Sequence, residues 1–159
     1  PRALHEPTNY EVKANLMWAA SLALNGLIGQ GVPQDWTTHH IGHELTAMFG
    51  IDHARTLAVV LPALLEARRS QKSAKILQFG ARVFGISDAN EAEAIDATIA
   101  QTAAFFESLG VPTRLSAYGI GEEAIPQIVA KLKANRRLRM GERLDVTPDT
   151  AGKILSLAL

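Results

Sequence analysis

The sequence contains no cysteine among its 159 residues. This excludes a disulfide framework and a thiolate metal site, so that any bound metal must be held by histidine or carboxylate. A chain without cysteine is compatible with a reducing compartment, and we expect a cytoplasmic protein.

An excess of charge of either sign is also lacking, because 16 Lys and Arg balance 16 Asp and Glu. Without a basic surface the attraction that holds nucleic acid or an anionic membrane is missing, and we expect neither partner. The apolar runs near residues 16–27 and 57–65 are interrupted by polar residues before they reach the length of about 18 that a transmembrane helix needs. The first residue is Pro1 and no signal-peptide pattern follows it, so we expect a processed or excised piece of a protein.

Strands that alternate with helices are missing as well, and helix signals occupy most of the chain. Start signals are Thr8 with Glu11, Asp35, Asp52, Ser70 or Ser73, Asp88 with Glu91, and the run Thr147-Pro148-Asp149. Helices are predicted over about residues 8–27, 35–50, 52–69, 73–85, 88–110 and 122–138, and from 147 onward, with a loop at 111–120. We therefore predict an all-α fold, a helical bundle of about seven helices in a single domain over residues 1–159.

The histidines form the most distinctive cluster of the sequence. Four of the five, His39, His40, His43 and His53, lie within fifteen residues. On a helix His39 and His43 share one face, whereas His40 is rotated by about 100° and is expected to be a bystander. Neutral imidazole suits zinc or ferrous iron. Composition and spacing alone leave two interpretations equally open, a metal site and a set of ordinary polar or core histidines.

Several other functional classes can be compared with this pattern. A zinc protease is excluded, because His43-Glu44 is not followed by the second histidine of a His-Glu-x-x-His motif. The glycines at 26, 29 and 31 follow a helix and not a strand, which excludes a dinucleotide fingerprint. A metal-dependent phosphohydrolase or a hemerythrin-like carrier would need further ligands, yet no histidine follows His53. A noncatalytic helical interaction domain needs no metal at all and stays open.

Seven short segments carry a more specific pattern. They are residues 25–29 (Asn-Gly-Leu-Ile-Gly), 31–36 (Gly-Val-Pro-Gln-Asp-Trp), 39–47 (His-His-Ile-Gly-His-Glu-Leu-Thr-Ala), 50–54 (Gly-Ile-Asp-His-Ala), 57–62, 105–113 and 145–148. Together they closely resemble the C-terminal domain of iron-containing, group III alcohol dehydrogenases, and most of all the branch of NADPH-dependent aldehyde reductases and butanol dehydrogenases. The resemblance covers essentially the whole chain. It implies a dehydroquinate synthase-like C-terminal fold and a parent oxidoreductase that interconverts short- to medium-chain aldehydes and primary alcohols.

The resemblance also implies roles for three histidines. In that family an Asp and three His hold iron or zinc, and the last two His are fourteen residues apart, as are His39 and His53. These two are therefore implied to be metal ligands. His43 matches a histidine that lies near the nicotinamide and the substrate, which implies a catalytic and cofactor-contacting role. His40 departs from the apolar residue usual at its position.

The resemblance implies further components that the chain does not contain. The first two metal ligands of the family and its N-terminal dinucleotide-binding domain have no match here. The implied cofactors are zinc or Fe(II) together with NADP(H) in the parent enzyme. The expected partners are a small aldehyde or alcohol substrate, the missing N-terminal domain and further copies of the chain in a homo-oligomer.

A shared metal sets a geometric condition on His39 and His53. Fourteen residues of straight helix would separate their Cα atoms by about 21 Å, whereas two histidine side chains bridge only about 10 Å. The chain must therefore turn back between them. We predict a break at Gly50 and Ile51, with His53 in the first turn of the next helix.

Overall fold

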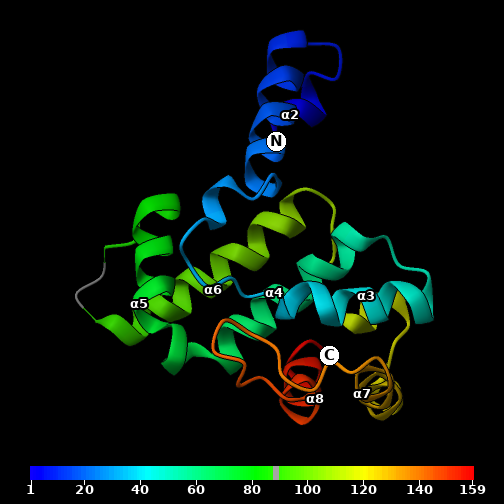
Figure 1. Cartoon of the computed structure of the whole chain (residues 1–159). Coiled ribbons are helices and arrows are strands. Elements are labelled where there is room, and N and C mark those ends of the chain that lie inside the picture. The colour runs from blue at the N-terminus through cyan, green and yellow to red at the C-terminus, as the bar shows by residue number, and fades with distance from the viewer. Residues whose placement is uncertain (88–89) are drawn as a thin grey trace. The chain divides into compact units, whose positions relative to one another are not determined.

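The computed structural model describes residues 1–87 and 90–159. The chain divides into two compact units, residues 1–34 and 35–159, and each is described by itself. The all-α prediction is confirmed: the described residues form eight α-helices and no strand, and they include one isolated bridge between Met140 and Val146 (Figure 1). Among these residues no helix is both long and apolar enough to cross a membrane.

The first unit contains α1 (Arg2–His5), α2 (Tyr10–Leu24) and a 3-10 turn (Leu27–Gly29). The prediction that Thr8 caps α2 is wrong, because Asn9 caps the helix and its side chain accepts a hydrogen bond of 3.3 Å from the Val12 N–H.

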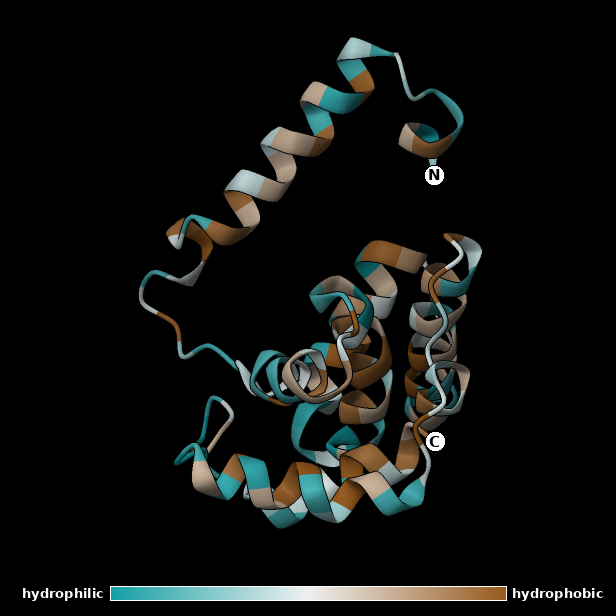
Figure 2. Cartoon of the chain, turned by 90° about the vertical axis from the view of Figure 1, so that its right-hand side faces the viewer, coloured by the Kyte–Doolittle hydropathy of each residue, from teal (hydrophilic) through white to brown (hydrophobic). Residues whose placement is uncertain are grey.

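Helix α2 has no buried residue. Apolar and polar residues alternate along it without forming one apolar stripe (Figure 2). Its exposed large apolar side chains are Tyr10, Leu16, Met17, Trp18 and Leu24.

The second unit contains the remaining helices. They are α3 (Thr37–Phe49), α4 (His53–Ala67), α5 (Arg69–Phe79) with a π-helical extension (Gly80–Phe84), α6 (Glu91–Ser108), α7 (Ile125–Ala134) and α8 (Pro148–Leu157). Short 3-10 turns at Leu115–Tyr118 and Glu122–Ala124 precede α7, so the predicted loop at 111–120 is partly helical. The Asp88 start signal lies outside the described residues, and the Asn90 side chain caps α6 by accepting a bond of 3.0 Å from the Ala92 N–H.

Two of the predicted helix boundaries differ by several residues from the observed ones. Helix α5 begins at Arg69, before Ser70 and Ser73, because only Arg68 separates it from α4. Helix α7 ends at Ala134 and does not reach Leu138, because Arg136 adopts a φ of +58°, which ends a right-handed helix.

The core of the second unit is built around α4. Pro62 lies inside this helix, which nevertheless continues to Ala67. Helix α4 contacts α3, α6 and α8, while α7 packs against α3 and α8 (Figure 1). The fully buried side chains of this core include Ile41 and Leu45 of α3, Val59 and Val60 of α4, Ile128 and Leu132 of α7, and Ile154 and Leu155 of α8.

The connection between α3 and α4 has the predicted geometry. Helix α3 ends at Phe49, and Gly50 follows with a φ of +69°, a conformation that favours glycine. Asp52 precedes α4, and His53 is the first residue of that helix. The break predicted between His43 and His53 is therefore confirmed.

Gly42 allows α3 and α4 to approach each other closely. A Cβ atom at this position would lie 2.7 Å from Thr56 Oγ1 and 3.2 Å from Leu57 Cδ2. The Thr56 hydroxyl also donates a hydrogen bond of 2.7 Å to the carbonyl oxygen of His53. A side chain at position 42 would therefore disturb the first turn of α4.

We expect Gly42→Ala to lower the free energy of unfolding, measured by urea denaturation. Overpacking costs about 1–3 kcal/mol, and the higher helix propensity of alanine offsets about 1 kcal/mol of that cost. In a double-mutant cycle with Thr56→Ala, the second substitution removes the nearest obstructing atom and should reduce the cost of the first. Additive effects of the two substitutions would show that this contact does not limit the approach of the helices.

Candidate metal centre

Three histidine rings meet at the junction of α3 and α4. His39 lies in the first turn of α3, His43 lies one turn further along, and His53 begins α4. The ring centroids of His39 and His53 are 5.4 Å apart, those of His43 and His53 4.6 Å, and those of His39 and His43 6.4 Å. The edge of the Trp36 ring packs against His39 at a centroid distance of 4.7 Å.

The chemistry of these rings fits a metal ligand. Burial lowers the pKa of His39, and the neighbouring His53 and His43 lower it further. Burial and His43 likewise lower the pKa of His53. A lowered pKa favours the neutral form of both imidazoles, which is the form that binds metals. In addition, His53 Nδ1 is buried and has no hydrogen-bond partner among the described residues, as is also the case for His40 Nδ1.

These histidines do not form a complete metal site. Within the described residues, no group of three or more His, Asp and Glu side chains is arranged to hold a metal ion. The acidic residues near the histidines have other partners. Asp35 contacts Lys72, Glu44 accepts a bond of 2.7 Å from the Asn135 amide, and Asp52 lies 3.5 Å from Arg55.

His40 has a different environment from the other three. Burial lowers its pKa, as does the neighbouring Arg137. In the part of the chain that the structure describes, its ring takes part in none of the ring contacts that join His39, His43 and His53. This agrees with its expected position on another face of α3.

An ion cluster near the start of α3 was missed by the sequence analysis. Asp35 was predicted only as the N-cap of α3, but Trp36 holds that position. The Asp35 carboxylate lies 2.7 Å from Lys72 Nζ, which also contacts Glu142 at 2.8 Å. Burial would raise the pKa of Asp35, but hydrogen bonds from Lys72 and Thr37 outweigh it and lower that pKa to about 2. No local pattern could have found this cluster, because its members are far apart in the sequence.

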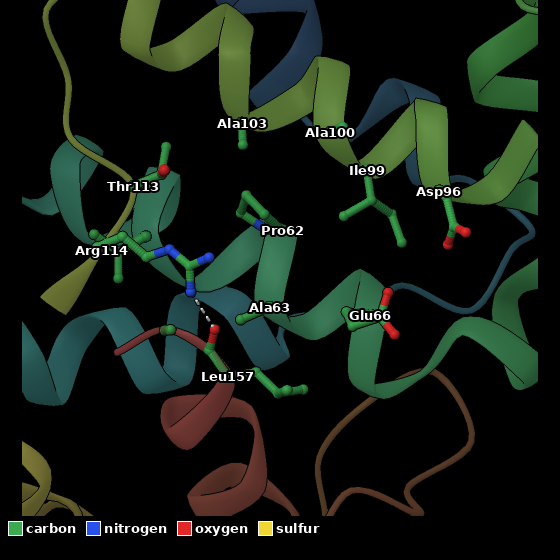
Figure 3. A pocket seen from close by; sticks show the side chains of 12 residues that line it. Pro62, Ala63, Glu66, Asp96, Ile99, Ala100, Ala103, Thr113, Arg114 and Leu157 are labelled. Atoms are coloured by element: carbon green, nitrogen blue, oxygen red, sulfur yellow. Dashed lines mark hydrogen bonds between the residues drawn. The ribbon is translucent and has the colours of Figure 1, made fainter. Parts of the chain in front are cut away.

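A separate cavity of about 410 Å³ lies between α4 and α6 (Figure 3). Its wall is mostly apolar, and the Arg114 guanidinium at its edge donates a bond of 2.9 Å to the Leu157 carbonyl oxygen. None of the four clustered histidines lines this cavity. The cavity is therefore not part of the histidine site.

Comparison with known proteins shows to which family the chain belongs. The sequence model for the C-terminal part of the Fe-containing alcohol dehydrogenase family matches residues 1–157. The chain belongs to this family. The resemblance found in the sequence is thereby confirmed.

The chain is similar in sequence to individual members of the family over nearly its whole length. The chain is 55% identical to the NADPH-dependent aldehyde reductase YqhD of Escherichia coli, over 99% of this chain and 41% of that protein. It is 35% identical to NADH-dependent butanol dehydrogenase B of Clostridium acetobutylicum, over 98% of this chain and 40% of that protein. It therefore spans about two fifths of the length of these relatives.

Solved structures show the same fold. The substrate- and cofactor-free form of YqhD from E. coli superimposes with a TM-score of 0.97 at 54% identity, over 100% of this chain and 42% of that one. NADH-dependent butanol dehydrogenase A of Thermotoga maritima gives a TM-score of 0.90 at 30% identity, over 99% of this chain and 41% of that one.

Proposed function

We propose that this chain is the metal-binding C-terminal part of an NAD(P)H-dependent oxidoreductase that interconverts short- to medium-chain aldehydes and primary alcohols. The observation that carries the proposal is the convergence of His39 and His53, 5.4 Å apart between ring centroids, in a chain of this family. The relatives include both NADPH-dependent and NADH-dependent enzymes, and the higher identity to YqhD favours NADP(H).

In this proposal His39 and His53 hold zinc or ferrous iron. When bound, the metal would act as a Lewis acid on the carbonyl oxygen, and the nicotinamide would supply the hydride. The two neutral imidazoles contribute nitrogen donors that both ions accept. The helix break at Gly50 brings these donors together from two helices, and Gly42 allows those helices to approach.

His43 is the residue that we assign to the reaction itself. Its ring lies beside that of His53, 4.6 Å away between centroids, without being one of the two proposed ligands. An imidazole at this place can orient the substrate oxygen and transfer a proton to or from it. We assign it the contact with the nicotinamide as well.

The remaining components lie outside residues 1–159 in this proposal. Residues 1–159 form the C-terminal helical domain, and a separate N-terminal domain binds the dinucleotide and completes the ligand set. The working enzyme is a cytoplasmic homo-oligomer. A noncatalytic interaction domain, a hydrolase or a carrier is less favoured, because the named relatives are reductases and dehydrogenases.

A titration with Zn²⁺ followed by NMR of the histidine rings tests the assignment of the ligands. We expect the His39 and His53 signals to shift together, and His39→Ala or His53→Ala to weaken binding by about tenfold or more. His40→Ala is the matched control, since it removes a neighbouring imidazole from another face of α3. Zinc binding that survives the loss of His53 but depends on His40 would overturn the assignment.

A further inference from the structure

Lys72 is held between two carboxylates in a sheltered position. Its Nζ lies 2.7 Å from Asp35 Oδ2 and 2.8 Å from each carboxylate oxygen of Glu142. The side chains of Lys72, Asp35 and Glu142 are only 13%, 17% and 29% exposed. The attraction between charges that are sheltered from water in this way is screened less than the attraction between charges on an open surface. We call these three residues the Lys72 cluster.

The Lys72 cluster is connected directly to the first turn of α3. The other carboxylate oxygen of Asp35, Oδ1, accepts a hydrogen bond of 2.8 Å from the backbone N–H of Thr37, the first residue of α3. His39 lies two residues further along in the same turn. This hydrogen bond links the Asp35 carboxylate to the turn that carries His39.

The other side of the cluster is attached to α5 and to a loop closed by backbone hydrogen bonds. Lys72 lies on α5, which follows α4 with only Arg68 between them. Glu142 lies in a loop closed by paired backbone hydrogen bonds between Met140 and Val146, of 2.8 and 3.0 Å. A second ion pair, between Arg68 and Asp145, joins that loop to the junction of α4 and α5. The start of α3 is thus connected through Lys72 to α5, and α5 follows directly on α4, whose first residue is His53.

We propose that the Lys72 cluster positions His39 for metal binding, by holding the first turn of α3 so that the His39 ring lies beside His53 before a metal arrives. This inference rests on the proposed role of His39 as a ligand. A preorganised pair of ligands binds more tightly than a pair that must first be ordered, because the ordering cost is already met in folding. The three residues are positioning residues, since none of them is one of the proposed ligands.

The test uses two readouts on Lys72→Met and Asp35→Asn, at temperatures well below unfolding. The first needs no metal and follows the nuclear Overhauser effect between the ring protons of His39 and His53, which should weaken in both variants. The second is the Zn²⁺ affinity, which should fall by about tenfold. The side-chain oxygen of asparagine can accept the same hydrogen bond from the Thr37 N–H, so Asp35→Asn removes the ion pair while it preserves that bond.

Matched controls separate positioning from plain stability. Lys133 and Asp149 form an ion pair of 3.0 Å whose side chains are 52% and 77% exposed, and Lys133→Met and Asp149→Asn should change neither readout. Lys72→Arg keeps the charge and should retain most of the affinity. Glu142→Gln removes one partner only and replaces Lys72→Met if that variant does not fold.

The outcomes distinguish this inference from the proposed function. If the cluster variants unfold at lower temperature but keep both the ring contact and the zinc affinity, the cluster only stabilises the fold and the inference is overturned. If the unaltered chain binds no zinc through His39, the proposed function fails, and an unchanged ring contact in the variants would then overturn the inference as well.

Discussion

The 159-residue chain alone is expected to give no measurable oxidation of NADPH with butanal, with or without added Zn²⁺ or Fe²⁺. Hydride transfer requires the nicotinamide and the carbonyl to be held in contact, and such positioning is equivalent to effective concentrations of about 10⁵–10⁸ M. The histidines of the described residues also form no complete metal site. Added metal should therefore bind weakly and should not restore activity.

The assay follows the loss of NADPH absorbance, with the E. coli aldehyde reductase YqhD as the positive control. Turnover by the chain alone that disappears in His39→Ala or His53→Ala would mean that it contains a complete active site. The proposal that it is only a part of the enzyme would then be wrong.

The second large effect is expected in a chimera. We expect this chain to yield an active aldehyde reductase when it replaces the matching 41% of YqhD, because the two are 55% identical and superimpose with a TM-score of 0.97. In the chimera, His53→Ala should lower kcat/KM by about a thousandfold, since Lewis-acid stabilisation amounts to several kcal/mol and each 1.36 kcal/mol is tenfold in rate. His43→Ala should lower kcat by about a hundredfold with the metal retained.

The measurements are steady-state kinetics with butanal together with the metal content of each purified variant. His40→Ala is again the control and should keep both activity and metal. An active chimera that tolerates His53→Ala would contradict the ligand assignment. A folded and metal-loaded chimera without activity would contradict the proposed reaction.

Local sequence signals predicted the start of α8 and the end of α3 correctly. Thr147 accepts a bond of 3.2 Å from the Thr150 N–H and Pro148 opens α8, while Gly50 closes α3. The predicted start of α2 and the predicted end of α7 were wrong. Asn9 caps α2 in place of Thr8, and Arg136 ends α7 through a left-handed conformation that no sequence signal for arginine indicates.

Residue types and short spacings along the chain were enough to predict the helical class, the family and the turn that brings His53 back toward His39. The distance between the rings could not be predicted in this way, because it depends on the packing of α3 against α4 at Gly42. The tertiary structure alone also brought Lys72 between Asp35 and Glu142, which lie 37 and 70 residues from it. Contacts of that kind arise when distant helices pack together, and no periodicity within a single helix records them.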